Sequence, residues 1–331
     1  MKTTRHCAPE RLRDISYPQS RGNSKLGDWM AAHRDPILAR LEQQGVVLLR
    51  DLDIMSTGQF ATLAAALFGD SLLSYSNRST PRTELKGRVY TSTEYPKEES
   101  IPQHNENSYS HEWPMKIAFL CLIAADRGGA TPVADSRAVY RRIPAGIREK
   151  FQRKGVMYVR HYSSVGLPWQ EVFQVQTRGE VDAYCQHHGI RARWLGDDQL
   201  RTEQVCPAVA THPHTGESVW FNQAHLFHVS NHTAENREAL LRTFGADRLP
   251  RQAYYGDGEA LEEDVLQTIR AIYEEEKIAF EWRSGDMVLL DNMLYSHGRD
   301  PFEGPRKVLV AMAEARNWTG AVAVAEQHAV A

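Results

Sequence analysis

Short apolar runs of strand length, separated by irregular polar connections, recur along most of this 331-residue chain. Clear examples are GVVLLRDLD (45–53), MKIAFLCLIAA (115–125) and the apolar run 287–290. Brief aliphatic runs bounded by turn residues are typical of buried strands. Because barrels and sandwiches with insertions reach this length, we expect one elaborated, mainly β domain, with two domains as the alternative.

Helices are predicted between some of these strands. Ser56 is a suitable N-cap for the apolar, helically spaced segment that follows it, and Gly69 is a suitable stop. A second helix is expected to begin near Asp135 and Ser136, and an amphipathic helix is expected over about 261–276. The pattern is therefore one of strands with flanking helices.

The segment 70–103 is polar and rich in turn residues, so we predict a long connection rather than a core element. Long ordered connections often carry binding groups. We expect residues 1–44 to form an N-terminal extension packed on the core and residues 45–318 to form the main domain. The last residues, 319–331, are expected to be a dispensable tail.

Composition argues against several classes of protein. With 24% charged residues and a formal net charge of −3, nothing favours a nucleic-acid partner. No apolar run approaches the roughly 18 to 20 residues that a membrane helix needs, and the N-terminus lacks the apolar centre of a secretion signal. We therefore expect a soluble cytoplasmic protein whose cysteines, which show no close pairing, are reduced: Cys7, Cys121, Cys185 and Cys206.

The stretch IPQHNENSYSHEWP (101–114) places His104 and Glu106 two positions apart in a segment that we predict to be extended. Side chains at i and i+2 of a strand point to the same face, so the imidazole and the carboxylate can converge on a metal ion. His297, far away in the sequence, would complete a set of two imidazoles and one carboxylate. This set suits a non-haem Fe(II) with open coordination positions. Each residue taken alone could equally be an ordinary core or surface residue.

A cationic group follows His297 at the entry to another predicted strand, GPRKVLVAMAEA. Arg306 or Lys307 could pair with a dicarboxylate held by the metal. We favour Arg306 because its planar fork binds two oxygens at once, and because strand alternation would turn Lys307 to the opposite face.

Taken in order, four stretches between about 45 and 315 carry a family resemblance: HNENSY, WPMKIAFLCLIAADRGGATPVADSR, WFNQ and GDMVLLDNMLYSHGRDPFEGPRK. The chain resembles the Fe(II)/2-oxoglutarate-dependent dioxygenases of the taurine dioxygenase and clavaminate synthase superfamily, particularly the branch of the syringomycin-pathway hydroxylases. The resemblance implies a double-stranded β-helix, the cupin-like jelly roll, flanked by helices.

The resemblance also implies roles for individual residues. His104, Glu106 and His297 would bind Fe(II), and Thr131 and Arg306 would contact 2-oxoglutarate, which is consumed together with O2. Related halogenases leave the carboxylate position to a small residue so that chloride can bind, so Glu106 favours hydroxylation.

Further residues have both a functional and a structural interpretation. A second metal site at His225 and His228 is an alternative to simple packing, and Asp291 and Asn292 could orient His297. The following could contact substrate or serve only as structural hydrogen-bonding and packing groups: Asn105, Asn107, Ser108, Tyr109, Phe221, Asn222 and Arg299.

The sequence therefore predicts an Fe(II)/2-oxoglutarate-dependent oxygenase that hydroxylates an amino acid, free or tethered to a carrier protein, in specialised metabolism such as antibiotic biosynthesis. Desaturation, epimerisation or cyclisation would use the same ligands. The competing class is a metal-binding jelly roll without redox turnover, such as a sensor or a zinc-dependent hydrolase or isomerase. A homo-oligomer is compatible with the sequence, and the oligomeric state is left open.

Overall fold

The computed structural model describes residues 15–74, 84–85, 87–92, 95–163, 166–196 and 198–318. The predicted tail and Cys7 therefore lie outside the described residues. Within these ranges, none of the helices combines the length and the apolar character needed to cross a membrane.

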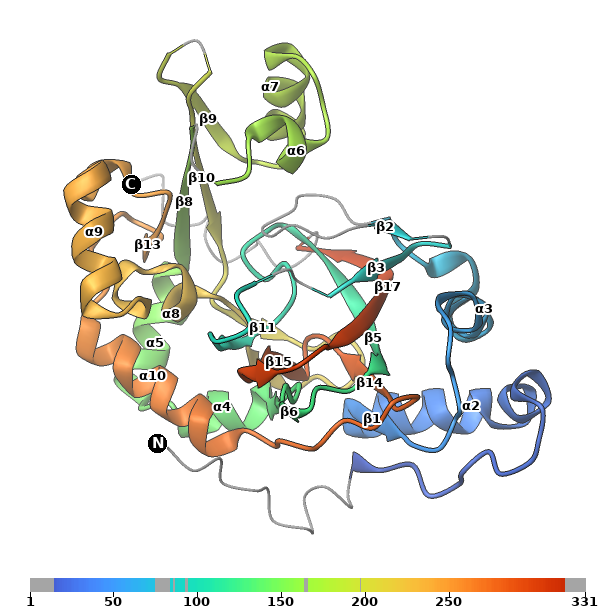
Figure 1. Ribbon diagram of the computed structural model, residues 1–331. Helices are drawn as coiled ribbons and strands as arrows, with labels where there is room; N and C mark the ends of the chain where they lie inside the picture. Colours follow the sequence, from blue (N-terminus) through green and yellow to red (C-terminus); the bar gives the residue numbers. More distant parts are fainter. Residues whose placement is uncertain are drawn as a thin grey trace.

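A six-stranded antiparallel sheet forms the centre of the molecule (Figure 1). Its two longest strands lie side by side and pair along most of their length. In spatial order the strands are β1 (Val46–Leu49), β14 (Met287–Asp291), β5 (Glu112–Ile123), β17 (Lys307–Asn317), β3 (Val89–Thr91) and β2 (Glu84–Leu85).

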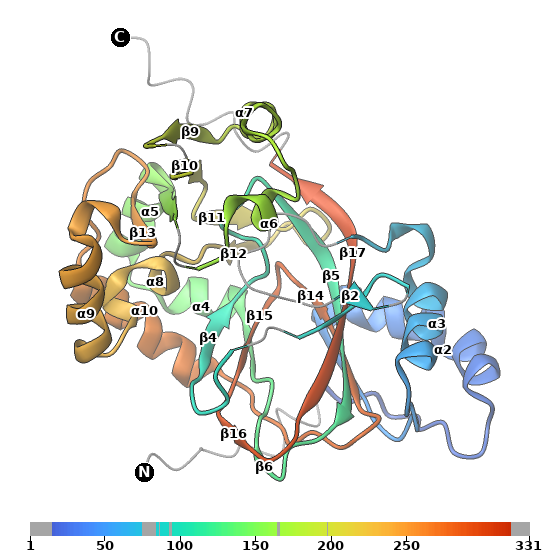
Figure 2. The ribbon, with the colours of Figure 1, turned by 45° about the horizontal axis from the view of Figure 1, so that its top comes forward.

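Smaller sheets face one side of this central sheet (Figure 2). Val133 and Tyr295 of the small sheet share an apolar cluster with the inward side chains of the central strands, so the core lies between the two sheets. The small sheet has the order β4 (Ile101–His104), β15 (Tyr295–Arg299) and β7 (Val133–Asp135), and two further pairs are β11 (Val209–Thr211) with β12 (Ser218–Trp220) and β16 (Phe302–Glu303) with β6 (Arg127–Gly128).

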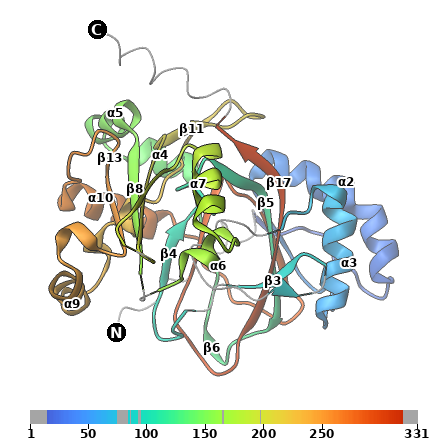
Figure 3. The ribbon, with the colours of Figure 1, turned by 90° about the horizontal axis from the view of Figure 1, so that it is seen from above.

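Two helices, α2 (Leu26–Gln44) and α3 (Thr57–Phe68), cover the other side of the central sheet (Figure 3). Alternation along β1 explains its unbroken apolar run: Val46 and Leu48 face the sandwich interior, whereas Val47 and Leu49 face the helices. As predicted, Ser56 caps α3 by accepting a hydrogen bond from the Gln59 amide, and Gly69 follows its last residue.

A separate four-stranded sheet stands on the side of the molecule opposite α2 and α3 (Figure 3). Its strands are β13 (Arg251–Tyr255), β8 (Val156–Tyr162), β10 (Leu200–Cys206) and β9 (Arg191–Trp194). The associated helices are α4 (Ser136–Arg142), α5 (Ala145–Lys154), α6 (Trp169–Phe173), α7 (Arg178–His187), α8 (Ala224–Phe227), α9 (Ala234–Phe244) and α10 (Glu263–Glu276), with short 3₁₀ turns η1 (Gly69–Ser71), η2 (Val229–Asn231) and η3 (Ala246–Arg248).

The prediction that residues 70–103 contain no core element is wrong in part. Val89 and Tyr90 are fully buried in β3, which pairs with β17, and β4 begins at Ile101. These strands are short and their flanks are polar, so the burial is supplied by neighbours distant in sequence rather than by a local apolar run.

The junction between α2 and β1 generates a prediction. Gly45 has φ +83°, and an added Cβ would lie 2.7 Å from the Leu294 Cβ and 2.9 Å from the Tyr295 Cδ2. Gly45→Ala should therefore lower the free energy of unfolding by about 2–4 kcal/mol, from left-handed strain and overpacking together. Gly27→Ala, on the same helix with open space around it, should change that free energy by no more than about 1 kcal/mol. Equal effects of the two substitutions in chemical denaturation would contradict this account.

Candidate metal centre

The pairing of β4 with β15 brings two histidines together. His104 and His297 are directly opposite one another in the register, and their ring centroids lie 4.4 Å apart. His297 is the third residue of β15. The two side chains therefore project from paired strands rather than from a flexible connection.

Glu106 reaches the same point from a turn. The expectation that it shares a strand with His104 is wrong, because β4 ends at His104 and the chain turns through Asn107, which has φ +56°. Asparagine tolerates this left-handed conformation better than most residues. One Glu106 carboxylate oxygen lies 3.9 Å from the His297 Nε2.

One potential ligand atom from each of His104, Glu106 and His297 lies within 4.8 Å of the other two. Among the described residues, this is the one group of three or more His, Cys, Asp or Glu side chains placed so that they could share a metal ion. The His104 Nδ1–H donates to the Pro102 carbonyl at 2.8 Å, since a carbonyl can only accept. Its Nε2 lone pair is thereby directed to the site, which is the usual arrangement for a metal-binding imidazole. Two imidazoles and the buried Glu106 carboxylate are suitable ligands for a divalent ion such as Fe(II).

Asn292, fully buried, fixes the turn that carries Glu106. The Glu106 amide donates to the Asn292 Oδ1 at 2.7 Å, and the Asn292 Nδ2 donates to the Glu106 and Pro114 carbonyls at 2.9 and 2.8 Å. The Asn105 Nδ2 donates to the Asn292 carbonyl at 2.7 Å. Asn292, one of the two residues that could have oriented His297, therefore binds the backbone around Glu106.

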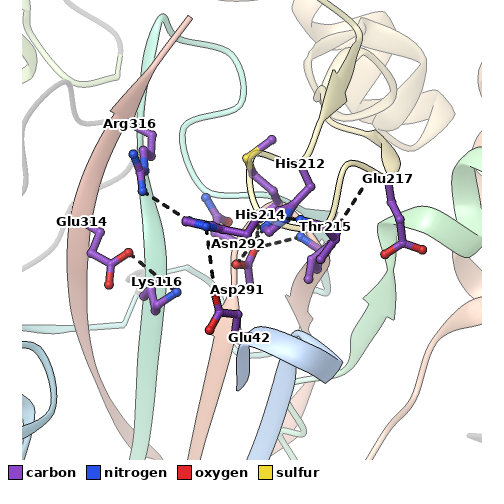
Figure 4. Close-up of polar contacts among 12 residues, drawn as sticks. Glu42, Lys116, His212, His214, Thr215, Glu217, Asp291, Asn292, Glu314 and Arg316 are labelled. Carbon is purple, nitrogen blue, oxygen red and sulfur yellow. Dashed lines mark hydrogen bonds and ion pairs between the residues drawn. The ribbon is translucent and has the colours of Figure 1, made fainter. Parts of the chain in front are cut away.

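Asp291, the residue before Asn292, is itself held by hydrogen bonds near His212 (Figure 4). Its carboxylate accepts from the Met293 and Leu294 amides and from the His212 Nε2 at 3.1 Å. His212 must donate through Nε2 because its Nδ1 accepts from the Thr215 amide. No sequence signal pointed to His212, since its partner is 79 residues away.

A small cavity of about 30 Å³ lies beside these residues. This volume is close to the share of one water molecule in the liquid. Its lining combines the histidines with apolar side chains and two arginines: Ser92, Ile101, His104, Phe119, Thr131, His297, Gly298, Arg299, Arg306 and Val308.

Arg306 and Thr131 meet at this cavity. The Arg306 guanidinium donates to the Gly129 carbonyl at 2.9 Å and to the Thr131 Oγ1 at 3.2 Å. The Trp282 Nε1–H also donates to that oxygen, so the Thr131 hydroxyl hydrogen remains available to a ligand. Burial, followed by the charge of Arg299, lowers the pKa of Arg306 to about 10. Lys307 is exposed and is not among the residues that line the cavity.

The remaining predicted residues mostly contact the protein itself. Arg299 lines the cavity but donates to the carbonyls of Tyr95, Pro96 and Glu99, holding that segment in place. The other candidates are buried within the turn or beside α8, and a substrate role for them stays a prediction: Asn105, Asn107, Ser108, Tyr109, Phe221 and Asn222.

His225 and His228 interact with neighbouring protein groups. The His225 Nε2 donates to the Gln103 carbonyl at 2.9 Å, next to His104, while the His228 Nδ1 accepts from the Ser230 amide. Burial lowers the pKa of His225 to about 3 and that of His228 to about 4. Within the part of the chain that the structure describes, they are not joined by the further ligands that a second metal site would need.

Sequence comparison identifies relatives over most of the chain. Residues 12–312 match the family described as taurine catabolism dioxygenase TauD, TfdA family. A dapdiamide synthesis protein of Enterobacter agglomerans is 40% identical over 294 residues, 88% of either chain. A clavaminate synthase-like protein of Arabidopsis thaliana is 31% identical over 284 residues, 82% of either chain. The predicted family resemblance is confirmed.

Solved structures share the fold. An asparagine oxygenase, solved with Fe(II), a hydroxyasparagine and succinate, aligns with a TM-score of 0.53 at 14% identity, covering 87% of this chain and 81% of its own. The PvcB protein from Pseudomonas aeruginosa aligns with a TM-score of 0.50 at 15% identity, covering 90% and 82%. The predicted jelly roll with flanking helices is confirmed.

The contacts of Asn292 predict that it positions Glu106. Asn292→Ala should lower the free energy of unfolding by about 2–4 kcal/mol, because several buried groups lose partners. It should also weaken anaerobic Fe(II) binding by about tenfold to a hundredfold. Asn222→Ala is the control, since Asn222 is equally buried but bonds Ala208 and Ala224. A stability loss in both variants with unchanged Fe(II) affinity in Asn292→Ala would refute the positioning role.

The buried histidines predict a pH dependence of stability. The folded-state pKa of His225, about 3, lies below the ordinary value of 6.5, so the unfolded chain binds more protons between these values. The free energy of unfolding should therefore fall as the pH drops from 6.5 towards 3, by at most about 1.4 kcal/mol per pH unit for this group. His228 contributes with the same sign. His225→Gln should make the free energy of unfolding less dependent on pH, whereas His187→Gln, at an exposed position, should not. If wild type and His225→Gln lose stability equally steeply as the pH falls, the lowered pKa is not that of His225.

Proposed function

The chain belongs to the TauD/TfdA family and is an Fe(II)- and 2-oxoglutarate-dependent dioxygenase, and we propose that it hydroxylates an amino-acid-type substrate, free or carrier-bound, in natural-product biosynthesis. The observation that carries this proposal is the convergence of His104, Glu106 and His297 beside a cavity whose charged groups are two arginines.

His104, Glu106 and His297 are proposed to hold Fe(II). The directed Nε2 of His104 and the restrained turn of Glu106 support this role, because both hold a ligand atom in place before the metal arrives. When bound, the iron with 2-oxoglutarate and O2 supplies an oxidative decarboxylation, giving succinate and carbon dioxide, that drives oxidation of a substrate carbon. Glu106 provides an anionic ligand where a halogenase would admit chloride, which favours hydroxylation.

Arg306 and Thr131 are proposed to bind the distal carboxylate of 2-oxoglutarate. Arg306 and Arg299 both line the cavity, and burial lowers the pKa of each. Two neighbouring cations are a poor arrangement without an anion, and a carboxylate between them would relieve the repulsion. The Thr131 hydroxyl can donate to the same carboxylate, since its oxygen already accepts twice.

The substrate class rests on two observations. The relative that shares 40% identity is named for dapdiamide synthesis, which supports a biosynthetic role. Arg299 also lines the cavity, so a carboxylate-bearing substrate such as an amino acid would meet a guanidinium group there. Desaturation, epimerisation and cyclisation are alternative reactions in which the substrate carbon has a different fate. The mass and the structure of the product distinguish them from hydroxylation.

A metal-binding jelly roll without redox turnover is a weaker alternative. A hydrolase or sensor has no need for a partly buried arginine and a hydroxyl donor arranged for a dicarboxylate beside the metal. The Arg306 and Thr131 pair therefore favours the oxygenase.

Turnover of a substrate panel is the direct test. Full-length protein with Fe(II), 2-oxoglutarate and O2 is expected to form succinate in step with a gain of one oxygen by an amino acid or its carrier-bound thioester. Succinate and substrate mass are measured in the same samples. If succinate forms while the substrate loses two hydrogens, the reaction is a desaturation or a cyclisation and not a hydroxylation. If neither free nor carrier-bound amino acids give a product in step with succinate, the proposed substrate class is wrong.

The co-substrate assignment predicts unequal effects for two neighbouring cations. Arg306→Ala should weaken 2-oxoglutarate binding by about one and a half to three and a half orders of magnitude, because a buried charge pair worth roughly 2 to 5 kcal/mol is lost. Fe(II) affinity should stay near wild type. The exposed Lys307→Ala is the matched control and should lose little. A titration in which Lys307→Ala loses affinity and Arg306→Ala does not would reverse the assignment.

A further inference from the structure

A second, larger cavity of about 450 Å³ lies on the four-stranded sheet. Strand β8 separates it from the candidate metal centre: the Tyr158 hydroxyl accepts from the Gln223 amide, and the Gln223 side chain donates to the Asn105 carbonyl beside the ligands. His161 lies three residues further along β8 and faces the opposite side. The cavity is lined by Val159, His161, Arg193, Leu195, Arg201, Ala246, Asp247, Arg248, Leu249, Gln252 and Tyr254.

Two arginines and a histidine form a row across this sheet. Arg201 of β10 is directly opposite Arg193 of β9 on one side and His161 of β8 on the other. Directly opposed side chains on one face have Cβ atoms about 4.5–5.5 Å apart, and like charges in such positions are destabilising. Arg248, from η3, lines the same cavity. The sheet therefore gathers three guanidinium groups and an imidazole around one space.

Acidic groups only partly balance this row. Glu203 pairs with Arg201, and it also pairs with Arg191 outside the cavity. Within the described chain, Arg193 and Arg248 make no hydrogen bond or ion pair, and Asp247 is the one acidic residue in the lining. Two arginines are thus available to an incoming anion.

His161 is oriented to take part. Its Nδ1–H donates to the Leu249 carbonyl at 2.8 Å, so its Nε2 is the atom left for a ligand. Burial lowers the pKa of His161, and the charges of Arg201 and Arg248 lower it further. An anion in the cavity would oppose these effects and raise the pKa of this imidazole.

We propose that this cavity binds an organic phosphate, with its phosphoryl oxygens on Arg193, Arg248 and the Arg201–His161 row. Guanidinium forks match the several acceptor oxygens of a phosphoryl group. The volume falls within the range of small-molecule sites and exceeds what a bare anion needs. Val159, Leu195 and the Tyr254 ring provide an apolar wall for the organic part.

The shared chemistry, a phosphate ester, has two sources: a free nucleotide or the phosphopantetheine arm of a carrier protein. Calorimetric titration of the full-length protein with AMP, adenosine, 4′-phosphopantetheine, pantetheine and inorganic phosphate distinguishes them. At least one phosphate ester should bind with a Kd below about 1 mM, and its phosphate-free counterpart should bind at least tenfold more weakly. Whichever ester binds more tightly identifies the source.

Matched variants locate the site. Arg193→Gln combined with Arg248→Gln should weaken binding of the ester by about tenfold to a hundredfold or more, because hydrogen bonds between charged groups are lost. Arg191→Gln, on the same strand but outside the cavity, should bind within about twofold of wild type. By NMR, the ester should raise the pKa of His161 in the wild type and not in the double variant. Absence of binding by both esters, equal binding of inorganic phosphate, or wild-type affinity in the double variant would overturn the proposal.

Discussion

The antiparallel pairing of β4 with β15 places two imidazoles opposite each other, and the geometry of the site depends on that register. A slip of one residue would turn one histidine to the other face. The Gln103 side chain resists such a slip by donating to the Pro132 carbonyl and accepting from the Ser296 hydroxyl. Gly298 permits the close approach of the strands, since a Cβ there would lie 2.7 Å from the Ile101 carbonyl oxygen.

The residue that holds Glu106 in place and the residue that brings positive charge to the cavity come from different parts of the fold. Asn292, itself anchored through Asp291 and His212, holds the turn of Glu106 from the side of the central sheet. Arg306 reaches the cavity from the entry to β17, so its position depends on the longest strand pairing in the fold. The proposed anionic ligand, Glu106, and the proposed cationic anchor, Arg306, thus come from different elements of the fold.

Four stretches of sequence were enough to predict the family by resemblance and, through it, the jelly roll. The pattern of residue types was enough to name the three residues that lie together at the candidate centre. Other features could not be predicted because they depend on long-range pairing. Asn292 acts on Glu106 across 186 residues of sequence, and the burial of Tyr90 comes from β17 rather than from its own segment. The strand alternation assumed for His104 and Glu106 failed because β4 ends at His104, and Glu106 lies in the turn that follows, next to Asn107 with its left-handed backbone. The basic row of Arg193, Arg201 and His161 exists only in the register of three strands.

The most direct test of the account is anomalous diffraction at the iron edge from crystals grown anaerobically with Fe(II) and 2-oxoglutarate. We predict a single strong peak bonded to the side chains of His104, Glu106 and His297, with 2-oxoglutarate extending from it to Arg306 and Thr131. An iron peak bonded to other side chains, such as His225 and His228, or a co-substrate that does not reach Arg306, would contradict the account.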